Sequence, residues 1–109
     1  MNNHPIQILG WVAADLRQAA EFYASWRTDG ASVFIEKYRD ALRLIELNPE
    51  LFPLKYGHFR RAPLHRSYFS IFYAIETHRT LIVAVIDTRR NPQTIRSMLD
   101  QRWHNENEE

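Results

Sequence analysis

The sequence predicts a two-layer α+β domain in which a helical hairpin and a C-terminal helix pack on a small antiparallel sheet. Three observations predict this class. Apolar residues recur at helical spacing through the first half, with one short break. Apolar and polar residues then alternate from about residue 58, and a wholly apolar run, "LIVAVI", follows. The expected order is β-α-α-β-β-β-α, and no repeat or linker divides residues 1–109, so we expect one domain.

The first half reads as a strand and two helices. "PIQILGW" alternates and predicts a short strand, and helical spacing begins at Val12. Gly30 is placed to end the first helix in the left-handed conformation. A second helix with Phe34, Tyr38 and Ile45 on one face ends at Asn48-Pro49. Because the break between the helices is short, they should form an antiparallel hairpin.

The second half reads as a three-strand meander and a helix. A loop, "NPELFPLKYG", precedes "HFRRAPLH", a strand that Pro63 weakens or confines to an edge. "SYFSIFYAIE" alternates as a strand, and "LIVAVID" is apolar on both faces, which favours a central position. Asn91 can cap a last helix that starts at Pro92 and reaches about Trp103, with a frayed acidic tail at about 104–109.

Composition excludes several classes of function. The 109 residues contain no cysteine and only three glycines, so disulfides, thiolate chemistry and a glycine-rich phosphate loop are excluded. The five histidines show no metal-ligand spacing, and we expect neither a metal nor a cofactor. The N-terminus lacks the pattern of a signal peptide, and the longest apolar run is too short to cross a bilayer. We therefore expect a cytoplasmic protein with no membrane partner.

Positive charge is concentrated in two segments although the formal net charge is only +1. Residues 55–66 contain four bases and no acid, and residues 79–96 contain four bases and one acid, Asp87. We expect sheet pairing to bring the two segments onto one surface, where guanidinium groups can bind phosphates or carboxylates. The ordinary alternative is solvated surface charge, with Arg90 paired to Asp87. The candidate partner-binding residues are Arg60, Arg61, Arg66, Tyr68, Arg89 and Arg90.

Four segments, taken in order, resemble the RelE/ParE superfamily of toxins from type II toxin–antitoxin (plasmid stabilisation) systems. They are "AADLRQAAEFY", "GASVFIEKYRDALRLIELNPELFP", "FRRAPLHRSYFSIFYAIE" and "IVAVIDTRRNP", and the resemblance runs from about Ile6 to Arg102. It implies a bacterial toxin with two helices on a small sheet. It also implies an antitoxin whose acidic C-terminal segment folds on binding, in a heterotetramer or a larger complex.

The resemblance leaves the molecular target open. RelE-like members cleave mRNA on the ribosome, and the resemblance maps the second-strand arginine of their site onto His65 or Arg66 and the last-strand arginine onto Arg89 or Arg90. The proton-transfer Tyr or His of that site is missing, because Ile95 or Arg96 stands there. ParE-like members inhibit DNA gyrase without being nucleases, and the missing group and near-neutral charge favour this subgroup. A non-toxic binding protein of the same fold is the third reading, and the role of Asp87 stays open.

Overall fold

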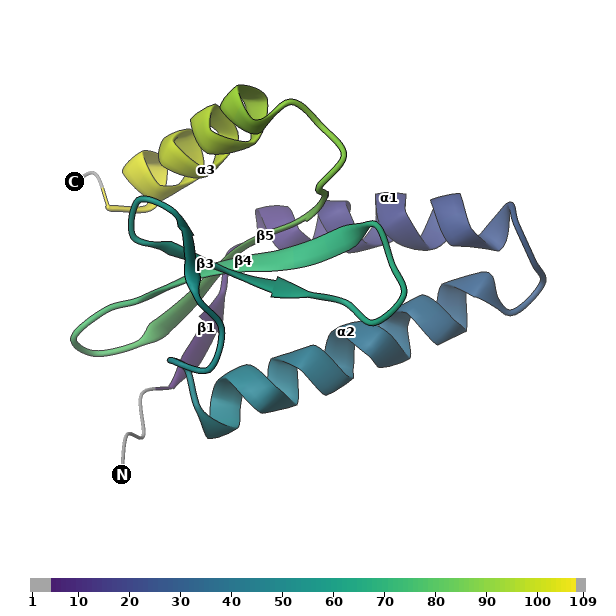
Figure 1. Cartoon of the computed structure of the whole chain (residues 1–109), viewed down its shortest axis with the longest axis horizontal. Coiled ribbons are helices and arrows are strands. Elements are labelled where there is room, and N and C mark those ends of the chain that lie inside the picture. The colour runs from purple at the N-terminus through teal and green to yellow at the C-terminus, as the bar shows by residue number, and fades with distance from the viewer. Residues whose placement is uncertain (1–4, 108–109) are drawn as a thin grey trace.

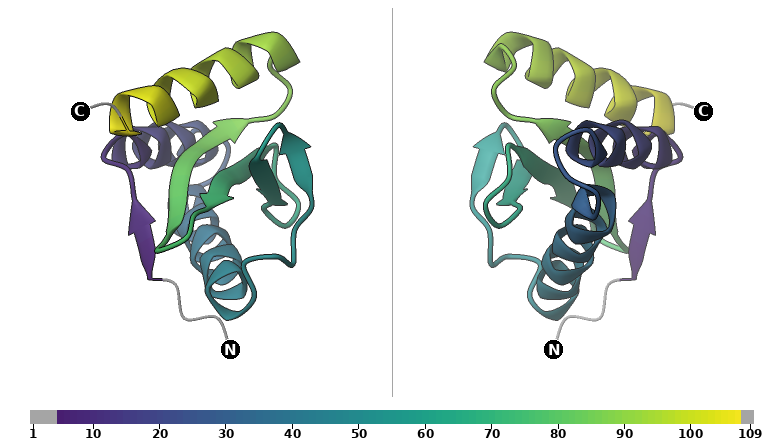
Figure 2. Two further views of the ribbon diagram at one scale, coloured as in Figure 1. Left: turned by 90° about the vertical axis from the view of Figure 1, so that its left-hand side faces the viewer. Right: turned by 90° about the vertical axis from the view of Figure 1, so that its right-hand side faces the viewer.

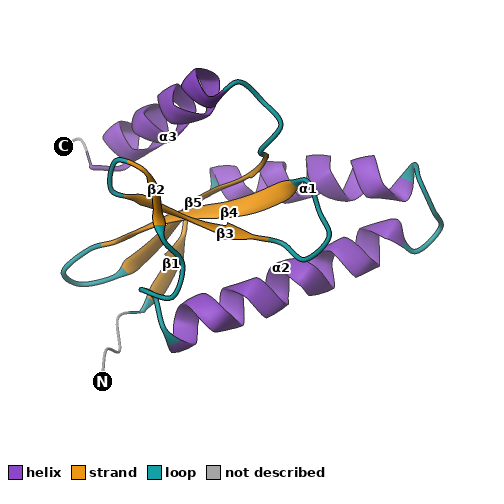
Figure 3. Ribbon diagram, viewed as in Figure 1, coloured by secondary structure: helices purple, strands orange, loops and turns teal. Residues whose placement is uncertain are grey.

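The computed structural model describes residues 5–107 and has the predicted α+β architecture (Figure 1). Five strands form one sheet in the order β1-β5-β4-β3-β2. The strands are β1 (Ile6–Ile8), β2 (Leu54–Tyr56), β3 (Phe59–Pro63), β4 (Phe69–Ile75) and β5 (Thr80–Asp87), and the helices are α1 (Trp11–Ala24), α2 (Gly30–Leu47) and α3 (Pro92–Asn107). Figure 3 shows the strands between α3 and α2.

The sheet contains two pairings that the sequence did not predict. The segment expected to be a loop before β3 contains β2, which pairs antiparallel with β3 through a turn at Gly57, where φ is +56°. In addition β1 runs parallel to β5, with Ile6 opposite Thr80, so the sheet is mixed rather than wholly antiparallel. The β3, β4 and β5 meander is antiparallel as expected, and β5 is interior, between β1 and β4, and almost fully buried; β3, expected at an edge, lies between β4 and β2.

The helices cover the two faces of the sheet. Phe69 of β4 packs against rings of both hairpin helices, with centroid distances of 5.8 Å to Tyr23 and 5.6 Å to Phe34. Phe59 of β3 instead meets Trp103 of α3 at 5.9 Å. Figure 1 shows α3 above the sheet and α2 below it, and Figure 2 shows α1 and α2 adjacent in both side views. No helix within residues 5–107 is long and apolar enough to cross a membrane.

The turn of the helical hairpin differs from the prediction for Gly30. α1 already ends at Ala24, and Gly30 is the first residue of α2 rather than a left-handed cap. The glycine is required by a close approach, because a Cβ there would lie 2.0 Å from the Tyr23 carbonyl oxygen. The hairpin therefore closes at a point where only glycine fits.

The predicted end of α3 near Trp103 was also wrong. The helix continues to Asn107, so residues 104–107 are not a frayed tail, while 108–109 lie outside the described residues. The extra turn has a partner: the Glu106 carboxylate lies 3.3 Å from the Arg79 guanidinium. Arg79 also donates to Gln7 at 2.8 Å and pairs with Glu76. The β4–β5 turn, β1 and the end of α3 are thereby held together.

A buried ion pair covers the outer edge of β5 beyond the point where β1 ends. The Val85 amide donates to Asp15 Oδ2 at 3.0 Å, and Arg102 Nη1 donates to the Val83 carbonyl at 3.0 Å. Asp15 and Arg102 also bind each other at 2.7 and 2.9 Å, with side-chain exposures of 8% and 13%. Two side chains from α1 and α3 thus provide the hydrogen bonds that a longer β1 would make.

We predict that Asp15→Ala lowers the free energy of unfolding by about 3–5 kcal/mol, because it leaves a buried guanidinium and a buried amide unpaired. Urea unfolding followed by circular dichroism measures this. Asp100→Ala is the control, since its exposed carboxylate lies 3.9 Å from Arg96 and should cost less than about 1 kcal/mol. Equal effects of the two changes would contradict the assigned role of Asp15.

We predict that Thr80→Val stabilises the protein by about 1 kcal/mol. Thr80 is fully buried, and within residues 5–107 its Oγ1 is the one buried side-chain polar atom without a hydrogen-bond partner. Valine keeps the shape and removes the unpaired hydroxyl. Thermal unfolding should show a midpoint higher by about 4–8 °C. Thr80→Ser keeps the hydroxyl and loses the methyl group, and a rise in its midpoint would contradict this explanation.

Candidate functional site

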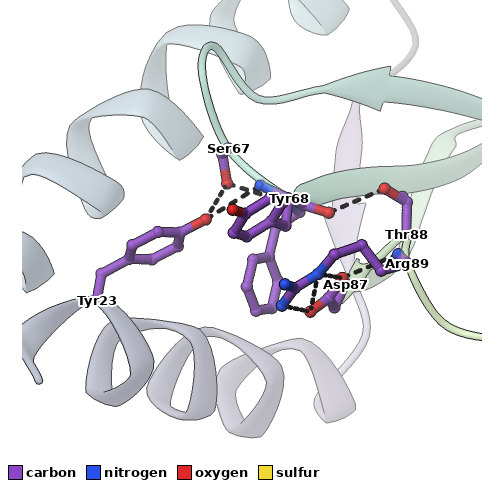
Figure 4. Close-up of polar contacts among 7 residues, drawn as sticks. Tyr23, Ser67, Tyr68, Asp87, Thr88 and Arg89 are labelled. Atoms are coloured by element: carbon purple, nitrogen blue, oxygen red, sulfur yellow. Dashed lines mark hydrogen bonds and ion pairs between the residues drawn. The ribbon is translucent and has the colours of Figure 1, made fainter. Parts of the chain in front are cut away.

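The β3–β4 turn and the loop from β5 to α3 meet at one end of the sheet (Figure 4). Both the amide and the hydroxyl of Thr88 donate to the Tyr68 carbonyl, at 2.8 and 2.9 Å. The Arg89 guanidinium lies over the Tyr68 ring, with its Cζ 3.7 Å from the ring centroid, a cation–π contact. Tyr68 is 40% exposed, so this stack forms part of the surface.

Asp87 binds the inner edge of the Arg89 guanidinium. Arg89 Nε donates to Asp87 Oδ1 at 3.0 Å, and Arg89 Nη2 donates to Oδ2 at 2.6 Å. Asp87 Oδ1 also accepts the Arg89 backbone amide at 2.9 Å. The sequence suggested Arg90 as the partner of Asp87, and this expectation was wrong, because Arg89 makes the two-pronged pair.

This geometry keeps Asp87 ionised. The hydrogen bonds from the Arg89 side chain lower the pKa of the Asp87 carboxyl below its ordinary 3.8, and the Arg89 amide and the nearby Arg90 charge act in the same direction. Partial burial opposes them without reversing the shift. In return Asp87 raises the pKa of Arg89. The Asp87–Arg89 pair is therefore a zwitterion with almost no net charge at neutral pH.

Side chains of both helices of the α1–α2 hairpin form hydrogen bonds with the β3–β4 turn. The Tyr23 hydroxyl accepts the Tyr68 amide at 3.0 Å and lies 2.9 Å from Ser67 Oγ. Lys37 Nζ donates to the Arg66 carbonyl at 3.3 Å. Arg66 itself has φ of +51°, in the left-handed region that a side chain makes costly. The turn thus places Arg66 outward on a backbone held by both helices.

The structure brings together four of the six candidate partner-binding residues. The turn that carries Arg66 and Tyr68 is hydrogen-bonded through the Tyr68 carbonyl to Thr88, next to Arg89 and Arg90 in the loop, and His65 is exposed in the same turn. The guanidinium groups of Arg66 and Arg90 are exposed, and no carboxylate of residues 5–107 lies within ion-pair distance of either one. The cluster of Arg66, Tyr68, Asp87, Arg89 and Arg90 is called the basic loop cluster below.

Arg60 and Arg61 lie apart from the basic loop cluster. Arg60 pairs with Tyr73, four residues along β4 from Phe69, a separation of roughly 13 Å at about 3.3 Å per residue. Its guanidinium donates to the Phe52 carbonyl at 2.8 Å, so it fastens the segment that follows α2. Arg61 follows directly on the strand, and its side chain therefore points to the opposite face.

Sequence reasoning missed the residues that hold the basic loop cluster in place. Tyr23 fitted the apolar spacing of the first helix, and nothing in that spacing showed that its hydroxyl binds Ser67, 44 residues away. Phe22, whose ring centroid lies 5.7 Å from the Arg89 Cζ, was likewise not singled out. No group of three or more His, Asp or Glu side chains within residues 5–107 is arranged to hold a metal ion.

The fold is similar to that of a solved structure. A solved structure described as a chromosomal ParDE toxin–antitoxin system from P. aeruginosa superposes with a TM-score of 0.59 at 15% sequence identity, covering 78% of this chain and 96% of that one. At that identity the likeness concerns the fold. No curated protein sequence matches.

The family itself is defined by a sequence match. Residues 10–92 match the model of the ParE toxin of the type II toxin–antitoxin system parDE. The chain therefore belongs to the ParE toxin family. The matched region contains α1, α2, every strand from β2 to β5 and the whole basic loop cluster.

We predict that Asp87 contributes to stability only above its unfolded pKa of about 3.9, because its folded pKa is lowered. The contribution is lost as the pH falls below about 4 and through the folded pKa. Wild type should exceed Asp87→Asn in free energy of unfolding by a constant amount from pH 7 to pH 5, and the difference should shrink below pH 4. Glu46→Gln, on an exposed part of α2, controls for a lost carboxylate. A difference that stays constant down to pH 2 would contradict the ion pair.

Proposed function

We propose that this ParE-family chain inhibits DNA gyrase and is neutralised by a cognate antitoxin with an acidic segment that folds on binding. The candidate contacts with the target are the exposed guanidinium groups of Arg66 and Arg90, which have no ion-pair partner among residues 5–107. The observation that carries this proposal over RNA cleavage is the Asp87–Arg89 pair, because it engages Arg89, one of the two last-strand arginines that an RNase site could use.

The electrostatics of the pair argue against phosphate chemistry at Arg89. A scissile phosphate is stabilised by free cationic donors aimed at its developing charge. Here two donors of Arg89 already bind a carboxylate, whose own charge would repel the phosphate. The lowered pKa of Asp87 also makes that carboxylate a weak base and an unavailable acid at neutral pH.

The residues at the expected proton-transfer position, Ile95 or Arg96, also argue against RNA cleavage. Ile95 is 1% exposed and packs in the core, so it has no chemistry to offer. Arg96 is exposed on α3, near the Asp100 carboxylate, and a guanidinium stays charged at neutral pH. A binding inhibitor needs none of these groups, which supports gyrase as the target.

The antitoxin proposal rests on the family and on a series of exposed leucines. The solved relative is described as a ParDE toxin–antitoxin system. In this chain four exposed leucines follow one another from the end of α2 to the edge strand β2, namely Leu44, Leu47, Leu51 and Leu54. We infer that these side chains form the apolar part of the antitoxin contact, since large exposed apolar patches mark interaction sites in soluble proteins. A segment that folds on binding could cover them while its acids reach the arginines.

A ribosome-dependent endoribonuclease is the second candidate function, and one observation favours it. His65 is exposed in the turn beside Arg66, and an imidazole is the usual side chain for proton transfer near pH 7. Arg66 is free to hold a phosphate there. Codon-phased mRNA ends that disappear with His65→Ala in a translating extract would establish this alternative and remove the gyrase proposal.

We predict that the purified chain abolishes supercoiling by gyrase at micromolar concentration and that its antitoxin restores the activity. The double variant Arg66→Gln, Arg90→Gln should weaken inhibition about tenfold or more, because each charge-assisted hydrogen bond contributes about 1.5–3 kcal/mol. The matched control is Arg39→Gln, Arg43→Gln, which removes two exposed charges from α2 and should not change inhibition. Supercoiling that continues unchanged with micromolar wild type would refute the proposal.

A further inference from the structure

The Arg89 guanidinium has one edge engaged and one edge free. A guanidinium carries five N–H donors. Asp87 takes the edge formed by Nε and one hydrogen of Nη2. The opposite edge, formed by Nη1 and the second hydrogen of Nη2, has no acceptor among residues 5–107. The side chain is 52% exposed, so a ligand can approach.

The free edge is held in one orientation. Asp87 fixes the plane of the group from the side, and its Oδ1 is itself fixed by the Arg89 amide at 2.9 Å. The Tyr68 ring supports one face at 3.7 Å, and Figure 4 shows the guanidinium lying across that ring. Tyr68 is held in turn by Tyr23 and Thr88. Little conformational entropy remains to be lost when a ligand binds this edge.

The shape and charge of this edge favour a neutral pair of acceptors. Two parallel donors match a carboxylate, a phosphate or the O6 and N7 atoms of guanine. Asp87 already balances the Arg89 charge, and a second full anion on the same guanidinium would be repelled by that carboxylate. Guanine offers the same two-acceptor geometry without a net charge. Arg66 and Arg90, exposed and unpaired within residues 5–107, can meet the flanking phosphates.

We propose that the free edge of Arg89 binds the O6/N7 edge of a guanine in DNA. Asp87 and Tyr68 act as positioning residues, and Arg66 and Arg90 neutralise neighbouring phosphates. This goes beyond gyrase inhibition, because it makes the toxin itself a DNA-contacting protein with a base preference. It also gives Asp87 a role: the carboxylate orients Arg89 and cancels a charge that would otherwise attract any phosphate.

The test measures binding of the full chain to short fluorescent DNA duplexes by anisotropy at low salt, without gyrase. A duplex with one central G·C pair is compared with the same duplex carrying 7-deazaguanine, which lacks N7, and with one carrying inosine, which keeps O6 and N7. We expect inosine to bind as guanine does and 7-deazaguanine to bind about fivefold more weakly or worse, since one acceptor of a two-pronged contact is lost.

Variants separate reading of the base from general attraction to DNA. Asp87→Asn should abolish the preference for guanine over 7-deazaguanine while total affinity stays equal or rises, because a negative charge is removed. Arg89→Lys should also abolish the preference, since an ammonium has no fork. Arg90→Gln and Arg66→Gln should weaken every duplex alike and each reduce the slope of log affinity against log salt by about one. Far-ultraviolet circular dichroism confirms that each variant is folded.

The inference is overturned if wild type binds guanine and 7-deazaguanine equally, or if Asp87→Asn keeps the discrimination. Stronger binding to single-stranded RNA or to a glutamate-rich peptide than to duplex DNA would also overturn it. Its failure is distinct from failure of the proposed function, because gyrase inhibition is scored separately. Inhibition without base discrimination would remove only the guanine contact, and discrimination without inhibition would remove only the gyrase target.

Discussion

The architecture depends on how the outer edge of β5 is completed. β1 pairs with only the first three residues of β5, and the polar groups of Val83 and Val85 would otherwise be buried without partners or open to another chain. Asp15 and Arg102 meet these groups and each other. One interaction therefore joins α1 to β5 and α3, although Asp15 of α1 lies 70 residues from Val85 and 87 residues from Arg102 in the sequence. Because β5 is held at this point, its end at Asp87 and the loop beyond it have a defined position.

That position explains why the arginines of the site differ in role although they look alike in the sequence. Arg89 is engaged with Asp87 and Tyr68, whereas Arg66 and Arg90 form no ion pair among residues 5–107. Arg60 serves the fold by binding main-chain carbonyls after α2. The arginines thus have three roles: Arg60 binds the fold, Arg89 is held in one orientation, and Arg66 and Arg90 have no ion-pair partner within residues 5–107. In our proposals Arg89 selects the partner, and the charges of Arg66 and Arg90 attract it over a longer range.

The fold could be predicted because its elements carry strong local signals. The spacing of the two helices, the alternation of β4 and the apolar β5 were each sufficient to identify an element. The errors fall where distant contacts decide the outcome. Gly30 begins α2 instead of ending α1, because the Tyr23 carbonyl lies too close for any side chain. The helix α3 continues to Asn107, where Glu106 pairs with Arg79. β2 is three residues long and depends on β3, so its own sequence carries little signal.

The site was predictable in part for the same reason. The sequence indicated which arginines to consider, and the register that pairs Phe69 with Asp87 places the β3–β4 turn beside the loop that carries Arg89, while Arg60 pairs with Tyr73 further along β4. The choice of Arg89 over Arg90 as the partner of Asp87 depends on the loop backbone, because the Arg89 amide and side chain reach the same carboxylate oxygen. Spacing along a chain does not encode such a choice.

Tyr23 links the closure of the hairpin to the surface that a partner would meet. Its carbonyl oxygen occupies the space beside Gly30, and its hydroxyl accepts a hydrogen bond from the Tyr68 amide. The ring of the same Tyr68 lies under the Arg89 guanidinium. A side chain introduced at position 30 would displace Tyr23, and the loss of its hydrogen bond would shift the Tyr68 ring beneath the Arg89 guanidinium. In a saturation screen for loss of toxicity, substitutions of Gly30 should therefore have the same effect as substitutions in the basic loop cluster, although Gly30 lies in the helical hairpin, outside that cluster.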